Sequence, residues 1–468
     1  MVRYFLILAS ILVCHLLKGQ SFVITNVNII PMTGGPILEN QSILIAKGKI
    51  KKIGPADNFV INKRALEIKG KGKYLMPGLV DMHMHYLADN LIPKDYIFDE
   101  LPVALSYGIT AARVPIGQPF HLRIREQIKK GILMGPDLYI AGHIAGSRFG
   151  DDFSVLVVKY PDKAAAAVID LKEEGYDLIK ISYDLSIEVY DQIIAASKIE
   201  SILVFGLVPP SVGIWKALEK GQNIEHLDQY FEGILPDDPK FEASVSGLGM
   251  MKKDNWKSLD YFTEKDIDKL VDATVRAGVW NTPTNYYFNT SFGKGKLEKE
   301  FANSPEYQLL SPEVRDELIK THNRFWSDPP PENLRRRYVM FRNMLIKKLY
   351  KKGGKILAGS NSPDAMNLYG LGLHRELQSL VEAGLSPYQA LETATVLPAK
   401  FLGMAKSWGT VTKGKSANLL LLDKNPLVNI SNTLSISGVF KGEDWIPRNI
   451  LKYMYSEARK SLSKAPLR

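Results

Sequence analysis

Two histidines, His83 and His85, stand one residue apart in the stretch PGLVDMHMHY at residues 77–86. Residues two apart on an extended segment project to the same side, so both imidazoles can bind one cation. Neutral imidazoles are common ligands of zinc and similar divalent metals. Histidines also occur in protein cores, where they pack or form hydrogen bonds. The position of this pair directly after an apolar run favours the metal site.

Other polar side chains follow apolar runs further along the chain, namely Lys180, His226 and Asn361. If these runs are parallel strands of one sheet, their carboxyl ends lie together at one face. His143, in IAGHIAG, is expected at the same face. We expect it to line the pocket, and a direct role as metal ligand is the alternative. The remaining pocket residues that we expect are Gly206, Tyr86, Tyr183 and Tyr287.

Eight short apolar runs, each followed by a helix-like segment, organise the middle of the chain. They occupy residues 74–82, 108–114, 137–142, 177–182, 202–207, 223–227, 279–284 and 355–360. This alternation predicts an α/β fold, the (β/α)8 TIM barrel. Functional groups of such barrels lie at the C-terminal ends of the strands, where the polar residues named above are found.

Segments that alternate apolar and polar residues occur near both ends of the chain. SFVITNVNIIPMTGG and SILIAKGKIKKIG lie near the start, and GTVTKGKSANLLLLD follows residue 408. The alternation predicts short antiparallel strands. We expect one small composite β-sandwich domain built from residues 21–74 and 405–450, around a barrel at 75–404 and before a basic tail at 451–468.

The first twenty residues have the features of an export signal. Arg3 precedes the apolar stretch FLILASILVCHLL, and KGQS follows it as a polar exit. A retained anchor is the weaker alternative, because the apolar run is shorter than the roughly 20 residues that span a membrane. We therefore expect a periplasmic or extracellular protein without an integral membrane segment after removal of the signal. Cys14 is the only cysteine, so the mature chain would contain neither a disulfide nor a thiol nucleophile.

The formal charge of +10 is spread over sixty Lys and Arg residues. This distribution predicts a solvated basic surface and no nucleic-acid partner. The expected pocket indicates a small-molecule substrate, and a homo-oligomer is left open. Two stretches, at residues 231–262 and 285–335, are longer than the connections that a minimal (β/α)8 barrel needs. The second is rich in aromatic residues and proline. It can form a wall of the substrate pocket or a loop with a small core of its own.

Several motifs together resemble the amidohydrolase superfamily, especially its imidazolonepropionase-like and prolidase-like members. They are MPGLVDMHMH, the lysine of GYDLIKIS, NIEHL, AGSNSP and the terminal GTVTKGKSANLLLLDKNPL. The resemblance covers residues 22 to about 430. It implies a barrel beside a composite β-sandwich, and a site that uses a metal to activate water against an amide, lactam or ester. By position it assigns His83, His85, Lys180 and His226 as metal ligands; in that superfamily the lysine is often carboxylated, which leaves both forms of Lys180 open.

Two positions depart from the pattern of that superfamily. Gly206 stands where relatives have a histidine on the fifth strand, and Asn361 stands where they have the aspartate that takes the proton. An amide has no basic site near neutral pH, so Asn361 can ligate a metal but cannot act as general base. We expect one divalent ion at most, preferably zinc. With fewer metals Lys180 can stay an ammonium group, which would need a partner such as Asp81 or Asp184.

These observations leave two hypotheses. The first is an exported hydrolase of carbon–nitrogen or related ester bonds that works with a single metal at His83 and His85. The second is a catalytically inactive relative that keeps the barrel as a binding or structural protein. The preserved ligands favour the first hypothesis, and the joint changes at Gly206 and Asn361 favour the second. A fold alone does not decide between them, because function depends on the site.

Overall fold

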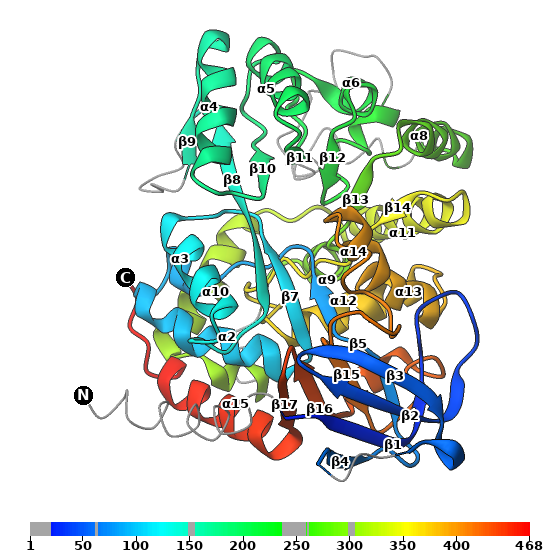
Figure 1. Ribbon diagram of the computed structural model, residues 1–468. Coiled ribbons are helices and arrows are strands. Elements are labelled where there is room, and N and C mark those ends of the chain that lie inside the picture. Colours follow the sequence, from blue (N-terminus) through cyan, green and yellow to red (C-terminus); the bar gives the residue numbers. More distant parts are fainter. Residues whose placement is uncertain (1–19, 61–63, 148–154, 236–258, 260–261, 298–304) are drawn as a thin grey trace.

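A computed structural model describes residues 20–60, 64–147, 155–235, 259, 262–297 and 305–468. It contains two sheets, a parallel one and a mainly antiparallel one (Figure 1). The proposed export signal therefore lies outside the described residues, as does most of the first insertion. Among the described helices, none combines the length and the apolar character needed to cross a membrane.

The parallel sheet is the barrel predicted from the eight apolar runs. Its strands follow the order β14-β13-β12-β11-β10-β8-β7-β6, with β9 beside β8. The bounds are β6 (Leu79–Asp81), β7 (Ile109–Val114), β8 (Asp137–Ala145), β9 (Val155–Val157), β10 (Leu178–Ile181), β11 (Leu203–Gly206), β12 (Asn223–Glu225), β13 (Trp280–Thr282) and β14 (Lys355–Ile356). Each predicted run contains one barrel strand, and residues of β7 and β10 are buried throughout, as expected for a sheet covered on both faces.

Helices cover the outside of this sheet (Figure 1). They are α2 (Ile97–Ser106), α3 (Pro119–Lys129), α4 (Pro161–Glu173), α5 (Ile187–Ile199), α6 (Gly213–Lys220), α8 (Glu264–Ala277), α9 (Asn285–Lys294), α10 (Pro312–Phe325), α11 (Glu332–Lys351), α12 (Leu371–Glu382), α13 (Pro387–Thr393) and α14 (Val396–Phe401). Short 3-10 turns lie at Ala56–Asn58, Leu87–Asp89, Lys94–Tyr96, Glu232–Ile234, Pro305–Leu309 and Ile430–Leu434.

Backbone hydrogen bonds join the first barrel strand to the segment that follows the last one. The amide of Met82 donates to the carbonyl of Ala358 at 2.9 Å. The amide of Asn361 donates to the carbonyl of His83 at 2.8 Å. The backbone amide of His85 donates to the backbone carbonyl of Ser362 at 2.7 Å. The chain around Asn361 is therefore held directly beside the histidine pair, as the barrel prediction required.

The second sheet combines both ends of the chain. Its order is β17-β16-β15-β5-β1-β2-β3, with β4 beside β1. The bounds are β1 (Phe22–Ile29), β2 (Leu38–Ala46), β3 (Lys49–Pro55), β4 (Leu66–Lys69), β5 (Tyr74–Pro77), β15 (Leu419–Leu422), β16 (Ile436–Lys441) and β17 (Asp444–Pro447). Strand β15 pairs antiparallel with β5, with Leu419 opposite Pro77. The final helix, α15 (Arg448–Leu462), packs on α2 and takes up most of the predicted basic tail.

The described part of the second insertion forms helices that bury several aromatic side chains. The rings of Phe292 and Trp326 meet at 5.1 Å, those of Phe292 and Tyr338 at 4.6 Å, and all three side chains are buried. Trp326 also donates from its indole nitrogen to the hydroxyl of Ser291 at 2.9 Å. Phe292, Trp326 and Tyr338 belong to the same buried cluster as residues of the barrel strands, so the described part of this stretch packs onto the barrel core.

Candidate metal centre

His83 and His85 follow β6 and face each other. Their Nε2 atoms lie 3.1 Å apart. Two nitrogen ligands on one metal, each about 2.1 Å from it, are separated by roughly 3.0–3.4 Å, depending on the angle between them. The pair therefore has the spacing that a shared ion requires. A hydrogen bond between the two rings would give a similar distance, so the protonation of each ring matters.

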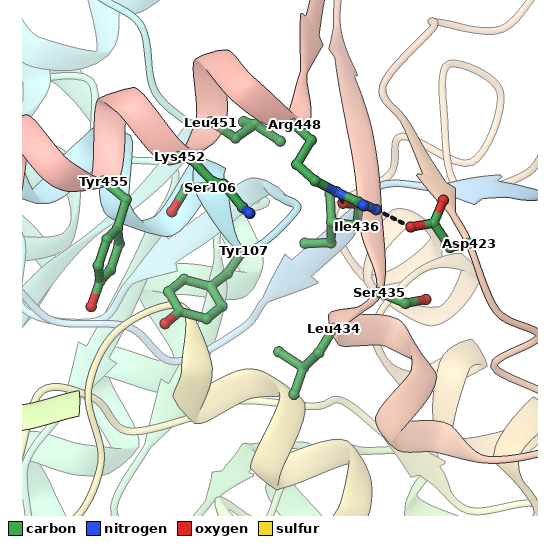
Figure 2. Close-up of a pocket in the computed structure, with 10 residues that line it drawn as sticks. All are labelled: Ser106, Tyr107, Asp423, Leu434, Ser435, Ile436, Arg448, Leu451, Lys452 and Tyr455. Carbon is green, nitrogen blue, oxygen red and sulfur yellow. Dashed lines mark hydrogen bonds and ion pairs between the residues drawn. The ribbon is translucent and has the colours of Figure 1, made fainter. Parts of the chain in front are cut away.

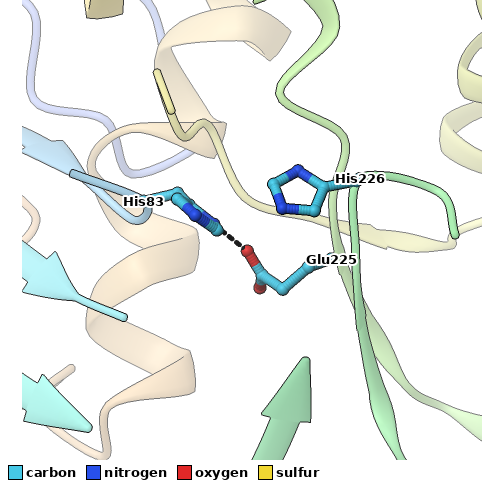
Figure 3. A group of neighbouring side chains, drawn as sticks. All are labelled: His83, Glu225 and His226. Carbon is cyan, nitrogen blue, oxygen red and sulfur yellow. Dashed lines mark hydrogen bonds and ion pairs between the residues drawn. The ribbon is translucent and has the colours of Figure 1, made fainter. Parts of the chain in front are cut away.

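Glu225, at the end of β12, determines the protonation of His83. Its carboxylate contacts Nδ1 of His83 through Oε2 (Figure 3). A carboxylate only accepts hydrogen bonds, so Nδ1 carries the proton and Nε2 keeps its lone pair toward His85. This arrangement of carboxylate and histidine is the usual way in which proteins orient a metal-binding imidazole.

Arg113, the fifth residue of β7, holds Glu225 from the other side. Its Nη2 lies 2.5 Å from Oε1 of Glu225 and 3.1 Å from Oγ1 of Thr282, while Nε donates to the carbonyl of Met82 at 2.6 Å. The guanidinium also lies 3.9 Å from the ring centroid of Phe205. The side chains of Arg113 and Glu225 are almost fully buried. The carboxylate is thus engaged by a cation and an imidazole, which makes it a positioning group for His83 and leaves it little capacity to bind a metal itself.

His226 follows Glu225 and brings a third imidazole to the site. Its ring centroid lies 4.6 Å from that of His83 (Figure 3). Its Nδ1 lies 2.8 Å from the hydroxyl of Thr284, which itself donates to the carbonyl of Pro283. The hydroxyl must therefore accept from Nδ1–H, and Nε2 of His226 keeps a lone pair. Arg342 of α11 fixes the backbone here by donating to the carbonyl of His226 at 2.7 Å.

Burial keeps these histidines neutral. Desolvation is the main cause that lowers the pKa of His83, His85 and His226 well below the usual value. Charge repulsion from Lys180 lowers the pKa of all three histidines further. Ligand atoms of His83, Glu225 and His226 also lie within 4.8 Å of one another, so these three side chains form a second possible donor group beside the pair of His83 and His85. Neutral imidazoles are donors that a divalent transition metal prefers.

Lys180, on β10, lies among these imidazoles. Desolvation lowers its pKa to about 8, and the carboxylate of Glu225 opposes this shift. The partners suggested from the sequence are occupied elsewhere. Asp81 accepts from the amide and hydroxyl of Ser360, at 2.9 and 2.6 Å. Asp184 accepts from the amide of Gly146 at 3.0 Å. Glu225, rather than either aspartate, supplies the compensating charge.

Asn361 lies where the last barrel strand ends, with a left-handed backbone at φ +56°. Asparagine adopts this region more readily than most residues, and aspartate shares the tendency. Asp81 stabilises the neighbouring turn through its bonds to Ser360 and to the amide of His83 at 3.1 Å. Burial raises the pKa of Asp81 to about 6. Its oxygens are used for these contacts, so Asp81 holds the turn in place and does not replace the missing base.

Gly206, the last residue of β11, is packed against the neighbouring strand. Its φ is +141°, and a Cβ atom added here would lie 2.3 Å from the carbonyl oxygen of Ile181. A real Cβ atom does not approach an oxygen so closely. The backbone at this position therefore excludes a histidine side chain unless the neighbouring strand shifts.

We expect Gly206→Ala to lower the free energy of unfolding by about 2–4 kcal/mol, because β10 and β11 must separate and φ is strained. Urea unfolding followed by tryptophan fluorescence measures this loss. Gly213→Ala is the matched control, since Gly213 also has a positive φ of +69° but nothing within 4 Å of an added Cβ. Equal losses in the two variants would contradict the steric explanation.

His143, on β8 opposite Lys180, lines the site from the third strand. Neither of its ring nitrogens has a hydrogen-bond partner among the described residues, although the side chain is buried. Desolvation and then Lys180 lower its pKa to about 3. Unpartnered buried nitrogens are costly, so a neutral ring of this kind is suited to a polar group of a bound ligand.

The three tyrosines expected in the pocket take different positions. Tyr86 is buried with its ring 5.8 Å from that of His121. Tyr287, on α9, meets the ring of Phe288 at 5.1 Å, and Phe288 lies 5.4 Å from His226. Tyr183 is partly exposed after β10. Of the three, Tyr287 is joined to the histidine cluster through a single intervening ring, that of Phe288.

Comparison with known proteins identifies the group to which this site belongs. The sequence profile of the Amidohydrolase family matches residues 344–446. A dihydroorotase from Carboxydothermus hydrogenoformans is 35% identical over 463 residues, which cover 92% of this chain and 95% of that protein. The chain belongs to the amidohydrolase family.

Two further proteins resemble this amidohydrolase over very different shares of its chain. An adenine deaminase from Staphylothermus marinus is 35% identical over 95 residues, which is 20% of this chain and 15% of that protein. The crystal structure of a putative prolidase from Bifidobacterium longum superposes with a TM-score of 0.67 at 20% identity, and covers 94% of this chain and 99% of that one. The latter likeness confirms the predicted barrel with its second, composite domain.

Sequence reasoning missed two residues of this site. Glu225 stands beside His226 in NIEHL, and Arg113 stands in TAARV. Both are charged residues at positions where a barrel strand should be buried, which was the available signal. Their pairing joins β7 to β12, and no local pattern in the sequence reveals which buried cation meets which buried carboxylate.

Proposed function

We propose that this amidohydrolase is an exported, metal-dependent hydrolase that cleaves carbon–nitrogen bonds or related esters in a small molecule. It uses at most one divalent ion. The observation that carries the proposal is the 3.1 Å separation of Nε2 in His83 and His85, with the proton of His83 fixed on Nδ1 by Glu225. Related proteins named prolidase and dihydroorotase suggest dipeptides and cyclic amides as first substrates to examine.

Each side chain has a definite task in this proposal. His83 and His85 would hold the ion, with His226 as the additional imidazole. A divalent ion such as zinc supplies Lewis acidity and activates water near neutral pH. His143 donates a hydrogen bond to a polar atom of the substrate, since its nitrogens have no protein partner among the described residues. Burial of the site excludes bulk water, which strengthens each of these polar contacts.

Proton transfer is the weak step of this site. The amide of Asn361 cannot accept the proton that an aspartate would take. Together with Gly206, this change favours the second candidate function, a protein that keeps the pocket for binding without turnover. Both functions require the same histidine cluster, so metal content and turnover must be measured separately.

The test is the metal content of the purified mature protein after dialysis with zinc or manganese offered separately. We expect about one equivalent of metal, because one pair of imidazoles has the required spacing. His83→Ala should abolish retention of this metal, together with any hydrolysis of a panel of dipeptides, lactams and esters.

The matched control is His322→Asn, which changes a histidine on α10 whose Nε2 contacts the carbonyl of Gly295. It should leave the metal content unchanged. Metal retention that survives His83→Ala would disprove the assigned site. Retained metal without turnover of any substrate would favour the binding protein. Cell fractionation followed by N-terminal sequencing tests export and signal removal. A chain found only in the cytoplasm and still beginning at Met1 would contradict export.

A further inference from the structure

A cleft of about 450 Å3 lies between the start of α15, the entry to β16 and the turn after α2 (Figure 2). It contains none of the residues of the metal centre. Arg448 and Lys452, four residues apart on α15, project to the same side of the helix and line it. We propose that this cleft is a second binding site, which takes a small organic anion through these two cations.

The charges around the cleft do not balance. Arg448 pairs through Nη2 with Asp423, and its Nε donates to the carbonyl of Ile436 at 2.6 Å. The same carboxylate pairs with Lys73. One carboxylate thus serves two cations, while the ammonium group of Lys452 has no partner among the described residues. The surplus positive charge attracts an anion and holds it at the wall of the cleft.

Hydroxyl groups in the cleft cannot replace these cations as donors. The hydroxyl of Ser106 donates to the carbonyl of Val103 at 2.7 Å, and that of Ser435 donates to Asn432 at 2.6 Å. A hydroxyl has one proton, so both are already committed. The hydroxyls of Tyr107 and Tyr455, which also line the cleft, form a hydrogen bond with each other. Arg448 and Lys452 supply the charged donors, which favour an anion over a neutral molecule of the same shape.

Apolar side chains complete the cleft and determine what the anion carries. Leu434, Ile436 and Leu451 line it together with the ring of Tyr107 (Figure 2). Leu434 is 43% exposed, so its contact with a ligand would remove apolar surface from water. The cleft therefore fits a carboxylate or phosphate with a short apolar body. This inference does not depend on the proposed hydrolase activity.

Calorimetric titration of the purified protein at low ionic strength tests the proposal with three probes, namely hexanoate, hexanamide and inorganic phosphate. We expect hexanoate to bind and the neutral amide of the same shape not to bind. Lys452→Gln should weaken hexanoate binding roughly tenfold, the loss expected for one charge-assisted hydrogen bond. Lys452 is exposed, so this variant should fold.

Lys198→Gln is the matched control, because it removes the same charge from an exposed position of α5, far from α15 in Figure 1. Its hexanoate affinity should equal that of the original protein. Phosphate binding with the same dependence on Lys452 would support the anion site and identify a phosphate as its ligand. Absence of binding by both anions, or equal binding to the two lysine variants, would overturn the proposal.

Discussion

Asn361→Asp should raise the turnover number of this amidohydrolase by about 10²- to 10⁴-fold, the usual contribution of a positioned general base. The backbone at this position accepts the change, because aspartate tolerates the left-handed region that Asn361 occupies. The amide of residue 361 is already bonded to His83, so the new carboxylate would be held beside the metal centre. Steady-state kinetics on the best substrate, with metal content measured in parallel, checks this expectation.

Asn40→Asp is the control for that experiment. Asn40 also has a positive φ, of +49°, and is an exposed residue of strand β2 in the other sheet. The control should leave turnover unchanged. If Asn361→Asp binds metal normally and still shows no gain in turnover, proton transfer is not what limits this site, and the binding function becomes the better explanation.

Glu225→Gln should weaken metal affinity about 10- to 100-fold, as loss of a group that orients a metal ligand commonly does. Glutamine keeps an oxygen near Nδ1 of His83 but loses the charge that favours one tautomer. It also leaves Arg113 buried without its carboxylate, which should reduce stability by about 3–5 kcal/mol. Competition with a chelator measures the affinity, and urea unfolding measures the stability.

Glu376→Gln separates these two effects. Glu376 is another buried carboxylate, and its two oxygens accept from the backbone amides of Asn285 and Tyr286 at 2.9 and 2.7 Å. Burial raises its pKa to about 7. We expect this variant to retain full metal affinity. A Glu225→Gln variant that binds metal as tightly as the original protein would show that Glu225 does not position His83.

The fold was largely predictable, because strand and helix periodicity are local properties of a sequence. The eight apolar runs each contain a barrel strand, and the ends of the chain share one sheet. The approach of His83, His85 and His226 followed from the barrel itself, since the ends of its strands meet at one face.

Charge pairing was less predictable for a physical reason. Lys180 could meet any buried carboxylate near its strand, and the choice of Glu225 over Asp81 or Asp184 depends on the packing of distant strands. The crowding around Gly206 is also a property of three-dimensional structure, because it depends on the carbonyl of Ile181 in the adjacent strand. Sequence reasoning identified that residue as a departure but assigned it no steric cause.

The pairing of β5 with β15 affects how the chain can fold during synthesis. Residues 74–77 emerge from the ribosome more than three hundred residues before their partners at 419–422. Until then β5 has an unpaired edge of the kind that promotes aggregation. Closing so long a loop is slow, and domains with distant contacts fold late. We therefore expect the nascent chain to depend on chaperones until β15 is made.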